Sequence, residues 1–331
     1  MQTLNLGWNR FEGLFPAHGF EKLSVLRKLE TLNLEHNEFN NNLLPSLSAL
    51  TSLKTLNIAW NKLEGLLPAH ELAYLGNVET LDLSSNQLSG IQGCETLSRL
   101  KKLETLSLSD NHFNKSIILC LSSLISLKNL FLQFTNLGDS FPARELTVLE
   151  NLEMLDLFGC GFSSLTLQDS KLLSKWSKMR HLDLSRNSFD KDILRILGAL
   201  PSLKFLSLDY NAMEGPLSNQ GLASFNHLEI LDLQQNGFHG SVPPFIGASS
   251  LKALYLSSNK FNGSLPIQGL CELKKLEELD LSDNHIEGIL PPCLSNLTSL
   301  RLFDLYGNQF TGNHLSSLLG SLNSLEYIDL S

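Results

Sequence analysis

One pattern recurs through the whole chain, L-x-x-L-x-L-x-x-N-x-(L/F), in which x stands for any residue. It starts fourteen times, with thirteen complete units and a truncated last one, and the asparagine positions lie 23 to 28 residues apart. Leucine fills 36 of the 42 positions in the three apolar columns. Units of this length cannot bury their apolar face alone, so the pattern predicts one solenoid over residues 1–331.

The middle of each unit alternates between leucine and a variable residue. This period of two predicts a short strand whose leucines point inward and whose other side chains face solvent. We therefore expect an α/β-type solenoid, a right-handed horseshoe with about fourteen parallel strands on its concave face. Most of it should be strand and turn, with little regular helix.

The asparagine column should form a hydrogen-bonded ladder, because each amide can pair with backbone groups that the turn leaves inside the core. Thr135 and Cys160 replace asparagine at two positions, so we expect fewer side-chain bonds there. An apolar residue follows two positions later, and it is often phenylalanine, which predicts a stacked aromatic row in the core. The phenylalanines of this row are Phe11, Phe39, Phe113, Phe162, Phe189, Phe238, Phe261 and Phe310.

Several units continue with G-x-x-P, in which glycine permits a positive φ and proline ends any further pairing. We expect a second short strand in the pair after the glycine, and then a turn or short 3₁₀ segment on the convex side. The glycines concerned are Gly13, Gly65, Gly240, Gly263 and Gly288.

This consensus resembles the plant extracellular class of leucine-rich repeats. Residues 271–282, 290–300 and 324–331 are further similar to plant receptor-like proteins of the disease-resistance type. The resemblance implies a cell-surface protein on the outer face of the plasma membrane, which binds a peptide or protein ligand and signals through a partner receptor kinase. Because the signal peptide, cap, island, transmembrane helix and kinase domain of the family are not found, we expect an internal segment of an ectodomain or a truncated gene product.

Composition argues against several other functions. The formal net charge is −9, which disfavours a nucleic-acid surface. No run of 18 apolar residues occurs, so we expect no membrane insertion by this segment. Asp280, Asp304 and Asp329 share one concave column, but without a nucleophile or an implied pocket they do not predict catalysis. We expect no enzyme activity, metal or cofactor.

The five cysteines lack C-x-x-C spacing and so predict no zinc or redox motif. We expect Cys120 and Cys293 to point inward as small buried apolar residues. A disulfide between Cys271 and Cys293 stays open as an alternative. Three glycosylation sequons begin at Asn114, Asn262 and Asn296, all outside the concave strand columns, so glycans there would leave the inner sheet free.

The candidate binding site is the concave face, because solenoids bind partners on this extended surface. Against small or polar neighbours, two groups of large side chains suggest contact with a partner. The first lies in strands six to nine: Phe131, Phe134, Phe158, His181, Arg186, Phe205, Asp209 and Tyr210. The second occupies one column of three successive units: Trp8, His36 and Trp60.

Two alternatives to a receptor-like protein share the same repeat. One is a secreted leucine-rich-repeat inhibitor of a microbial cell-wall-degrading enzyme, although those inhibitors are shorter and carry capping cysteine pairs. The other is an ectodomain segment of a receptor kinase, which the flanking coding sequence would distinguish.

Overall fold

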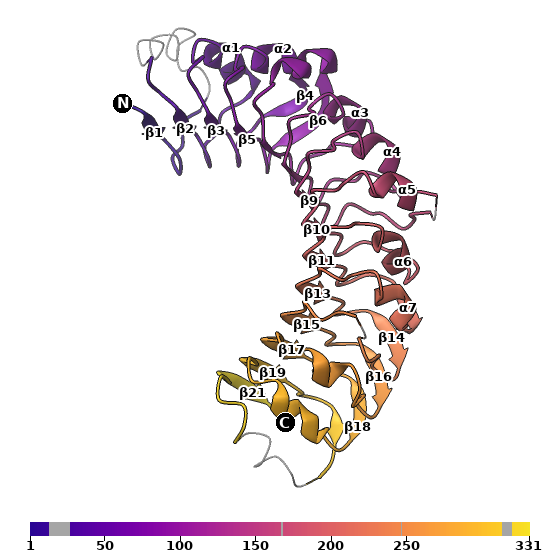
Figure 1. Ribbon diagram of the computed structural model, residues 1–331. Helices are drawn as coiled ribbons and strands as arrows, with labels where there is room; N and C mark the ends of the chain where they lie inside the picture. The colour runs from indigo at the N-terminus through magenta and orange to yellow at the C-terminus, as the bar shows by residue number, and fades with distance from the viewer. Residues whose placement is uncertain (13–26, 167, 246, 313–319) are drawn as a thin grey trace. The chain divides into compact units, whose positions relative to one another are not determined.

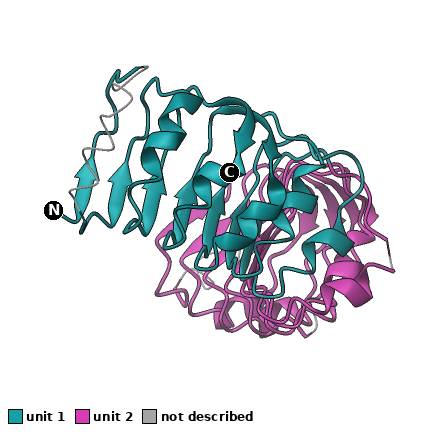
Figure 2. Ribbon diagram, turned by 90° about the horizontal axis from the view of Figure 1, so that it is seen from above, with its two compact units in different colours: residues 1–161 teal, residues 162–331 magenta. Residues whose placement is uncertain are grey.

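The computed structural model describes residues 1–12, 27–166, 168–245, 247–312 and 320–331. Gly13, one of the bend glycines, lies outside the described residues. The chain divides into two compact units, Met1–Gly161 and Phe162–Ser331, called unit 1 and unit 2 below (Figure 2). Each unit is a stack of repeats, and each is described by itself.

In unit 1, seven strands of the described residues pair in parallel in the order of the chain (Figure 1). The leucines align in register, with Leu32 opposite Leu56 and Leu56 opposite Leu81. These strands are β1 (Thr3–Asn5), β2 (Thr31–Asn33), β3 (Thr55–Asn57), β5 (Thr80–Asp82), β7 (Thr105–Ser107), β8 (Asn129–Phe131) and β9 (Met154–Asp156).

Unit 2 repeats this arrangement with seven further parallel strands in its described residues. Leu206 lies opposite Leu182 and Leu231, and all three are buried. The strands are β10 (His181–Asp183), β11 (Phe205–Ser207), β13 (Ile230–Asp232), β15 (Ala253–Tyr255), β17 (Glu278–Asp280), β19 (Leu302–Asp304) and β21 (Tyr327–Asp329). The predicted short parallel strands with inward leucines are confirmed in both units.

The asparagine ladder is present, and its bonds explain why this residue recurs. The side-chain nitrogen of Asn111 donates to the carbonyl oxygens of Leu83, Leu108 and Ser109 at 3.0–3.2 Å. Its side-chain oxygen accepts the N–H of Leu88 at 3.0 Å. One amide therefore pairs four backbone groups of two adjacent repeats.

At the two ladder positions without asparagine, the backbone groups of the turn have different hydrogen-bond partners. The Thr135 hydroxyl donates to the carbonyl of Leu132, and the Cys160 thiol contacts the same carbonyl oxygen at 3.0 Å. The N–H of Leu137 donates to the backbone carbonyl of Cys160 at 3.1 Å, where an asparagine would accept with its side chain. The interruption predicted here is confirmed, because a hydroxyl or thiol has only one hydrogen to donate.

The phenylalanine row packs in the core of each unit. The ring centroids of Phe11 and Phe39 lie 6.4 Å apart, and those of Phe238 and Phe261 lie 6.0 Å apart, in near-parallel orientation. The side chains of Phe39, Phe238 and Phe261 are fully buried. They therefore serve packing, as predicted.

A second sheet follows the ladder in each unit. In unit 1 it consists of β4 (Glu64–Pro68) and β6 (Gln87–Gln92). In unit 2 it consists of β12 (Glu214–Pro216), β14 (Gly237–Gly240), β16 (Lys260–Gly263), β18 (His285–Gly288) and β20 (Gln309–Phe310).

The position of these second strands corrects one expectation. The strand was expected after the bend glycine, but β14, β16 and β18 end at Gly240, Gly263 and Gly288. Each of these glycines has a positive φ, between 70° and 85°. This conformation turns the chain out of the extended state, so pairing stops there. In contrast, β4, β6 and β12 continue through the glycine at this place, which is Gly65, Gly90 or Gly215, and β4 shifts register after Gly65.

The outer side of the repeats carries short helical segments. Within the described residues, seven of these are single α-helical turns where turns or 3₁₀ segments were expected. They are α1 (Leu44–Leu47), α2 (Ala69–Leu72), α3 (Ile117–Leu121), α4 (Ala143–Leu146), α5 (Ser170–Leu173), α6 (Ile193–Leu197) and α7 (Asn219–Leu222). The 3₁₀ segments are η2 (Asn41–Leu43), η3 (Cys94–Arg99), η4 (Leu270–Glu272) and η5 (Pro292–Asn296). In α3 the α form buries Ile117, Ile118 and Leu121 together, because residues three and four apart share one helix face.

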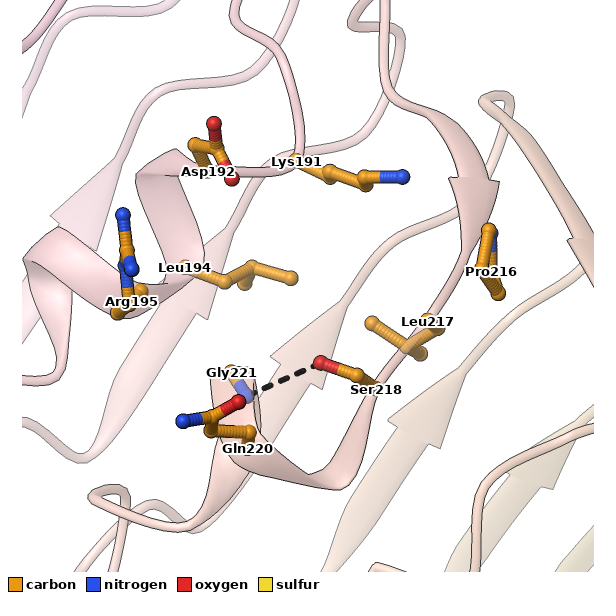
Figure 3. A pocket seen from close by; sticks show the side chains of 9 residues that line it. All are labelled: Lys191, Asp192, Leu194, Arg195, Pro216, Leu217, Ser218, Gln220 and Gly221. Carbon is orange, nitrogen blue, oxygen red and sulfur yellow. Dashed lines mark hydrogen bonds between the residues drawn. The ribbon is translucent and has the colours of Figure 1, made fainter.

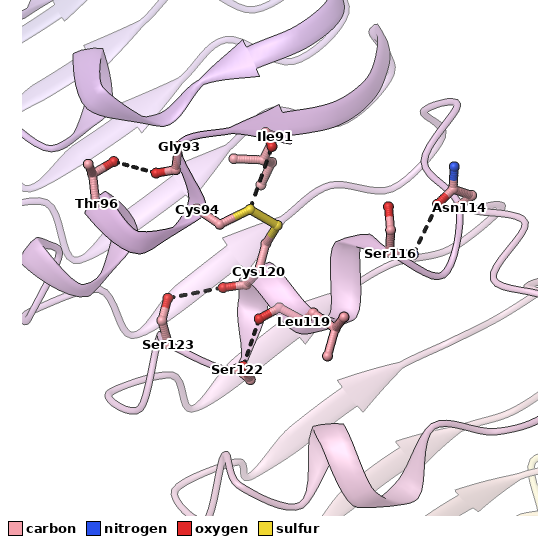
Figure 4. Close-up of a disulfide and its surroundings, with 10 residues drawn as sticks. All are labelled: Ile91, Gly93, Cys94, Thr96, Asn114, Ser116, Leu119, Cys120, Ser122 and Ser123. Carbon is pink, nitrogen blue, oxygen red and sulfur yellow. Dashed lines mark hydrogen bonds between the residues drawn. A yellow bond between two sulfur atoms is a disulfide. The ribbon is translucent and has the colours of Figure 1, made fainter.

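Two disulfides tie adjacent repeats on the outer side. Cys94 in η3 bonds Cys120 in α3, with their Cα atoms 5.0 Å apart (Figure 4). Cys271 bonds Cys293 with a Cα separation of 5.7 Å, which decides the alternative left open by the sequence. The expectation that Cys120 and Cys293 are unpaired apolar residues is wrong, because the helical turns bring cysteines of neighbouring coils together.

Candidate functional site

The residue immediately before each ladder position has a left-handed backbone conformation in every repeat, with φ between 49° and 69°. We call these residues the turn row. In unit 1 they are Trp8, His36, Trp60, Ser85, Asp110, Phe134 and Gly159, and in unit 2 they are Arg186, Tyr210, Gln235, Ser258, Asp283 and Gly307. Bulky side chains are disfavoured in this region, where glycine and asparagine are easiest. Aromatic residues in the turn row therefore need a reason beyond folding.

The backbone explains why the turn row is in register from repeat to repeat. The N–H of Trp60 donates to the carbonyl of Ser84 at 3.0 Å, and the N–H of Ser85 donates to that of Ser109 at 2.9 Å. The N–H of Asp110 likewise donates to the carbonyl of Gln133 at 2.7 Å. Each turn-row side chain therefore occupies an equivalent place one coil after the last.

The predicted group of Trp8, His36 and Trp60 forms a stack in unit 1. The centroids of Trp8 and His36 lie 4.1 Å apart, and those of His36 and Trp60 lie 6.2 Å apart at a tilt of 53°. Trp8 is 71% exposed and Trp60 is 54% exposed. An open groove runs beside these rings and reaches Ser85 and residues of the next repeat.

Three residues of the other predicted group lie in unit 1. Phe134 is 55% exposed and meets Phe158 edge to face, with centroids 5.0 Å apart. Gly159 makes room for this ring, since a Cβ atom there would lie 3.1 Å from Phe134 Cδ1. Phe131 ends β8 and is half-buried.

The remaining five residues of that group lie in unit 2. His181 and Phe205 stack across β10 and β11 with centroids 3.8 Å apart and an angle of 1° between their planes. The guanidinium carbon of Arg186 lies 4.8 Å from the centre of the Tyr210 ring. Asp209 accepts a hydrogen bond from Ser207 Oγ at 3.0 Å.

Burial alters the acid–base properties of this surface in unit 2. It lowers the pKa of His181, although Asp183 acts in the opposite direction. Burial also raises the pKa of Asp232 to about 6, and Asp209 and Asp183 add to the rise. We therefore expect the His181 imidazole to be neutral near neutral pH, and the Asp232 carboxyl to lose its proton at a higher pH than an ordinary aspartate.

The aspartate column of unit 2 is a structural feature of the turn. Asp280, Asp304 and Asp329 are neighbours in register, as expected. Asp280 accepts the N–H of Ser282, two residues on, at 2.9 Å. In unit 1, Asn33 accepts the N–H of Glu35 in the same way at 2.9 Å. An Asx turn accounts for these carboxylates without a catalytic role.

The three sequons begin at exposed asparagines. Asn114 lies in the loop before α3, the helix that carries Cys120 (Figure 4). Asn262 lies in β16 of the second sheet, and Asn296 ends η5. These positions leave the exposed face of the main sheet uncovered, but glycosylation at them stays a prediction.

A groove of unit 2 lies away from the main sheet, between α6 and α7. It is lined by charged residues that include Lys191, Asp192 and Arg195, and by the apolar Leu194 and Leu217 (Figure 3). The N–H of Gly221 donates to Ser218 Oγ at 3.4 Å across its floor. Opposite charges along its wall give it no single preference for an anion or a cation.

Other kinds of site are not found in the part of the chain that the structure describes. There, no group of three or more histidine, cysteine, aspartate or glutamate side chains is arranged to hold a metal ion. Within the same residues, no helix has the length and apolar character to cross a membrane.

Comparison with known families identifies the repeat. Residues 20–237, more than half of the chain, match the family described as "Leucine-rich repeat region", and residues 249–310 match "Leucine rich repeat". The chain belongs to the leucine-rich repeat family. A shorter match over residues 227–248, also to a leucine-rich repeat, overlaps the end of the first match.

The leucine-rich repeats of this chain are similar to those of Receptor-like protein 13 from Arabidopsis thaliana. The two are 42% identical over 145 residues, which make up 43% of this chain and 14% of that protein. The matched segment is thus far shorter than the relative. This likeness supports the resemblance to plant receptor-like proteins that residues 271–282, 290–300 and 324–331 suggested.

Solved structures of leucine-rich repeat proteins share the fold. The Arabidopsis receptor kinase HAESA, in complex with the peptide hormone IDA and the co-receptor SERK1, has a TM-score of 0.75 and 25% identity, over 99% of this chain and 58% of that one. The protein LIC12759 of Leptospira interrogans has a TM-score of 0.77 and 28% identity, over 100% and 84%. The fold therefore extends beyond plants, and the plant assignment rests on the sequence likeness.

Proposed function

We propose that this chain is a ligand-recognition segment of a plant cell-surface receptor-like protein, and that the exposed face of its main sheet binds a peptide or protein. The observation that carries this proposal is the turn row. Exposed tryptophan, phenylalanine and tyrosine occupy backbone positions that disfavour them, and the structure gives them no place in the core. Contact with a partner accounts for both features.

Two further observations support a cell-surface setting. The disulfides of Cys94 with Cys120 and of Cys271 with Cys293 suit an oxidising compartment. The receptor-like relative is a plant protein, and HAESA binds a peptide hormone together with a co-receptor. By analogy, we expect a partner receptor kinase for this protein, and a binding role in place of catalysis.

The experiment compares two triple variants of the chain with the unchanged protein. Phe134→Ser, Phe205→Ser and Tyr210→Ser remove aromatic rings from the exposed face of the main sheets. The matched control carries Leu119→Ser, Ile125→Ser and Ile267→Ser, which are exposed apolar residues outside those sheets. Peptides and proteins of plant extracellular fluid that bind each immobilised protein are identified by mass spectrometry, and their affinities are measured by calorimetry.

We expect at least one species to bind the unchanged chain and the control saturably, and to lose at least tenfold in affinity for the sheet-face variant. Equal binding to all three proteins, or loss in the control alone, would contradict recognition by this face. Thermal unfolding of each variant checks that its fold is intact.

A further inference from the structure

The turn row of unit 1 has a gap between an aromatic ring and a carboxylate. Trp60, Ser85 and Asp110 hold successive places in the row, as their equivalent backbone hydrogen bonds establish. The serine is too small to fill its place, and the groove beside Trp60 reaches it. The rings of His36 and Trp60 are tilted by 53° with their centroids 6.2 Å apart, and Ser85 holds the place on the other side of Trp60 in the row.

Unit 2 contains a guanidinium and an aromatic ring at adjacent places of the turn row. There Arg186 and Tyr210 are adjacent in the turn row, and the guanidinium lies 4.8 Å from the ring centre. A guanidinium one coil away from an aromatic turn-row residue therefore stacks on it without distorting the repeat. In unit 1 the residue one coil before Trp60 is His36, and Ser85, one coil after Trp60, carries no cation.

The dimensions of the gap suit one guanidinium. Trp60 and Asp110 are two coils apart, which corresponds to about 10 Å at the usual strand spacing. A cation stacks within about 6 Å of a ring centre, and a charge-assisted hydrogen bond to a carboxylate takes about 3 Å more. A guanidinium above Ser85 thus reaches both the Trp60 ring and the Asp110 carboxylate.

Asp110 is available for such a contact. Its side chain is exposed, and the structure gives its carboxylate no hydrogen bond or ion pair among the described residues. The cation Lys62, which lines the groove beside Trp60, is already paired with Glu38 at 2.7 Å. Trp60 keeps the left-handed φ of 55° at an exposed site, so its indole is held where it does not serve packing.

We propose that Trp60, Ser85 and Asp110 form a slot for an arginine side chain of the ligand. The indole stacks on the guanidinium, the serine leaves space for it, and the carboxylate accepts its N–H groups. Lysine fits less well, because an ammonium lacks the flat face and the fork of donors. This proposal rests on the proposed function and names one chemical group that the ligand presents.

The test uses two peptides that differ in charge and not in shape. The probe is acetyl-Gly-Arg-Gly-amide, and its neutral counterpart has citrulline in place of arginine. Binding is followed through the NMR signal of the Trp60 indole N–H, assigned with Trp60→Phe. We expect saturable binding of the arginine peptide at least tenfold tighter than that of the citrulline peptide.

Two substitutions should remove the slot, and two serve as matched controls. Trp60→Asn removes the indole and introduces a residue that tolerates the left-handed backbone, and Asp110→Asn removes the negative charge. We expect each substitution to weaken binding of the arginine peptide about tenfold. Because Trp60→Asn removes the reporting indole, its binding is followed through backbone amide signals. Tyr74→Asn, at an exposed ring outside the turn row, and Asp283→Asn, elsewhere in the row, should leave binding unchanged.

A third substitution fills the slot from within the chain. Ser85→Arg should place a guanidinium beside Trp60 from the following coil, and should abolish binding of the probe. Equal binding of both peptides, or binding unaffected by Trp60→Asn and Asp110→Asn, would overturn the proposal. Such a result would leave the function itself standing, because the test of the sheet-face variant alters neither Trp60 nor Asp110.

Discussion

The imidazole of His181 lies flat on the ring of Phe205, with their centroids 3.8 Å apart and their planes 1° from parallel. The two residues face each other across paired strands, in register. This stack shields one face of the imidazole from water, and burial lowers the pKa of His181. The exposed sheet of unit 2 therefore holds a histidine that resists protonation.

Phe205→Ala should raise the pKa of His181 toward its ordinary value, because the imidazole gains water on the uncovered face. A histidine with a lowered pKa stabilises the fold above its unfolded pKa, and this contribution is lost as the pH falls. The variant should therefore lose less stability than the unchanged chain between about pH 7 and pH 5. NMR titration of the imidazole measures the pKa directly. An unchanged pKa would show that Phe205 does not shield it.

Asp232→Asn should raise stability at neutral pH by on the order of 1 kcal/mol. The pKa of Asp232 is about 6 in the folded chain, above its ordinary value, so the ionised form is destabilising. Stability from this group is present at low pH and is lost as the pH rises through about 6. Asparagine still accepts the N–H of Gln234, as Asn33 does for Glu35. Urea unfolding at pH 4 and pH 7 checks this, and a larger gain at pH 4 would contradict it.

Glu229 should make stability depend on pH in the opposite direction. It binds Lys204 at 2.6 Å and Lys252 at 2.7 Å, and these hydrogen bonds lower its pKa to about 2. Its contribution is present above the ordinary pKa of 4.5 and is lost as the pH falls toward 2. Glu229→Gln should cost no more than about 1 kcal/mol at pH 7, because both ammonium groups are half-exposed. Salt should reduce the loss; a loss that is the same in 1 M salt would exclude an electrostatic cause.

The ladder should respond differently at its complete and substituted positions. Asn111→Ala leaves three carbonyls and the N–H of Leu88 without their amide partner, so we expect a loss of about 1–3 kcal/mol. Cys160→Asn should be neutral or stabilising, because it restores the amide. Chemical unfolding of both variants measures this. A clear loss of stability in Cys160→Asn would show that the turn at Cys160 no longer fits asparagine.

The sequence alone determined the repeat, its register and the inward direction of the leucines. A regular period is enough for this, since every coil must bury the same face against the next. The period by itself assigns Leu206 a place in the core and Asn111 a role in the turn. The outward direction of Trp60 and Phe134 follows from the same register.

Only the tertiary structure decided which side chains meet. The Cys94–Cys120 bond depends on how far the helical turns of two coils shift past each other, and the period does not set that distance. The stack of His181 on Phe205 depends on rotamers. The repeat places Trp60, Ser85 and Asp110 in one column of the sequence. That they form a slot depends on the left-handed turn, which holds Trp60 and Asp110 in equivalent places on either side of Ser85. Register fixes neighbours along the repeat, whereas contact depends on backbone conformation and the fit of neighbouring coils.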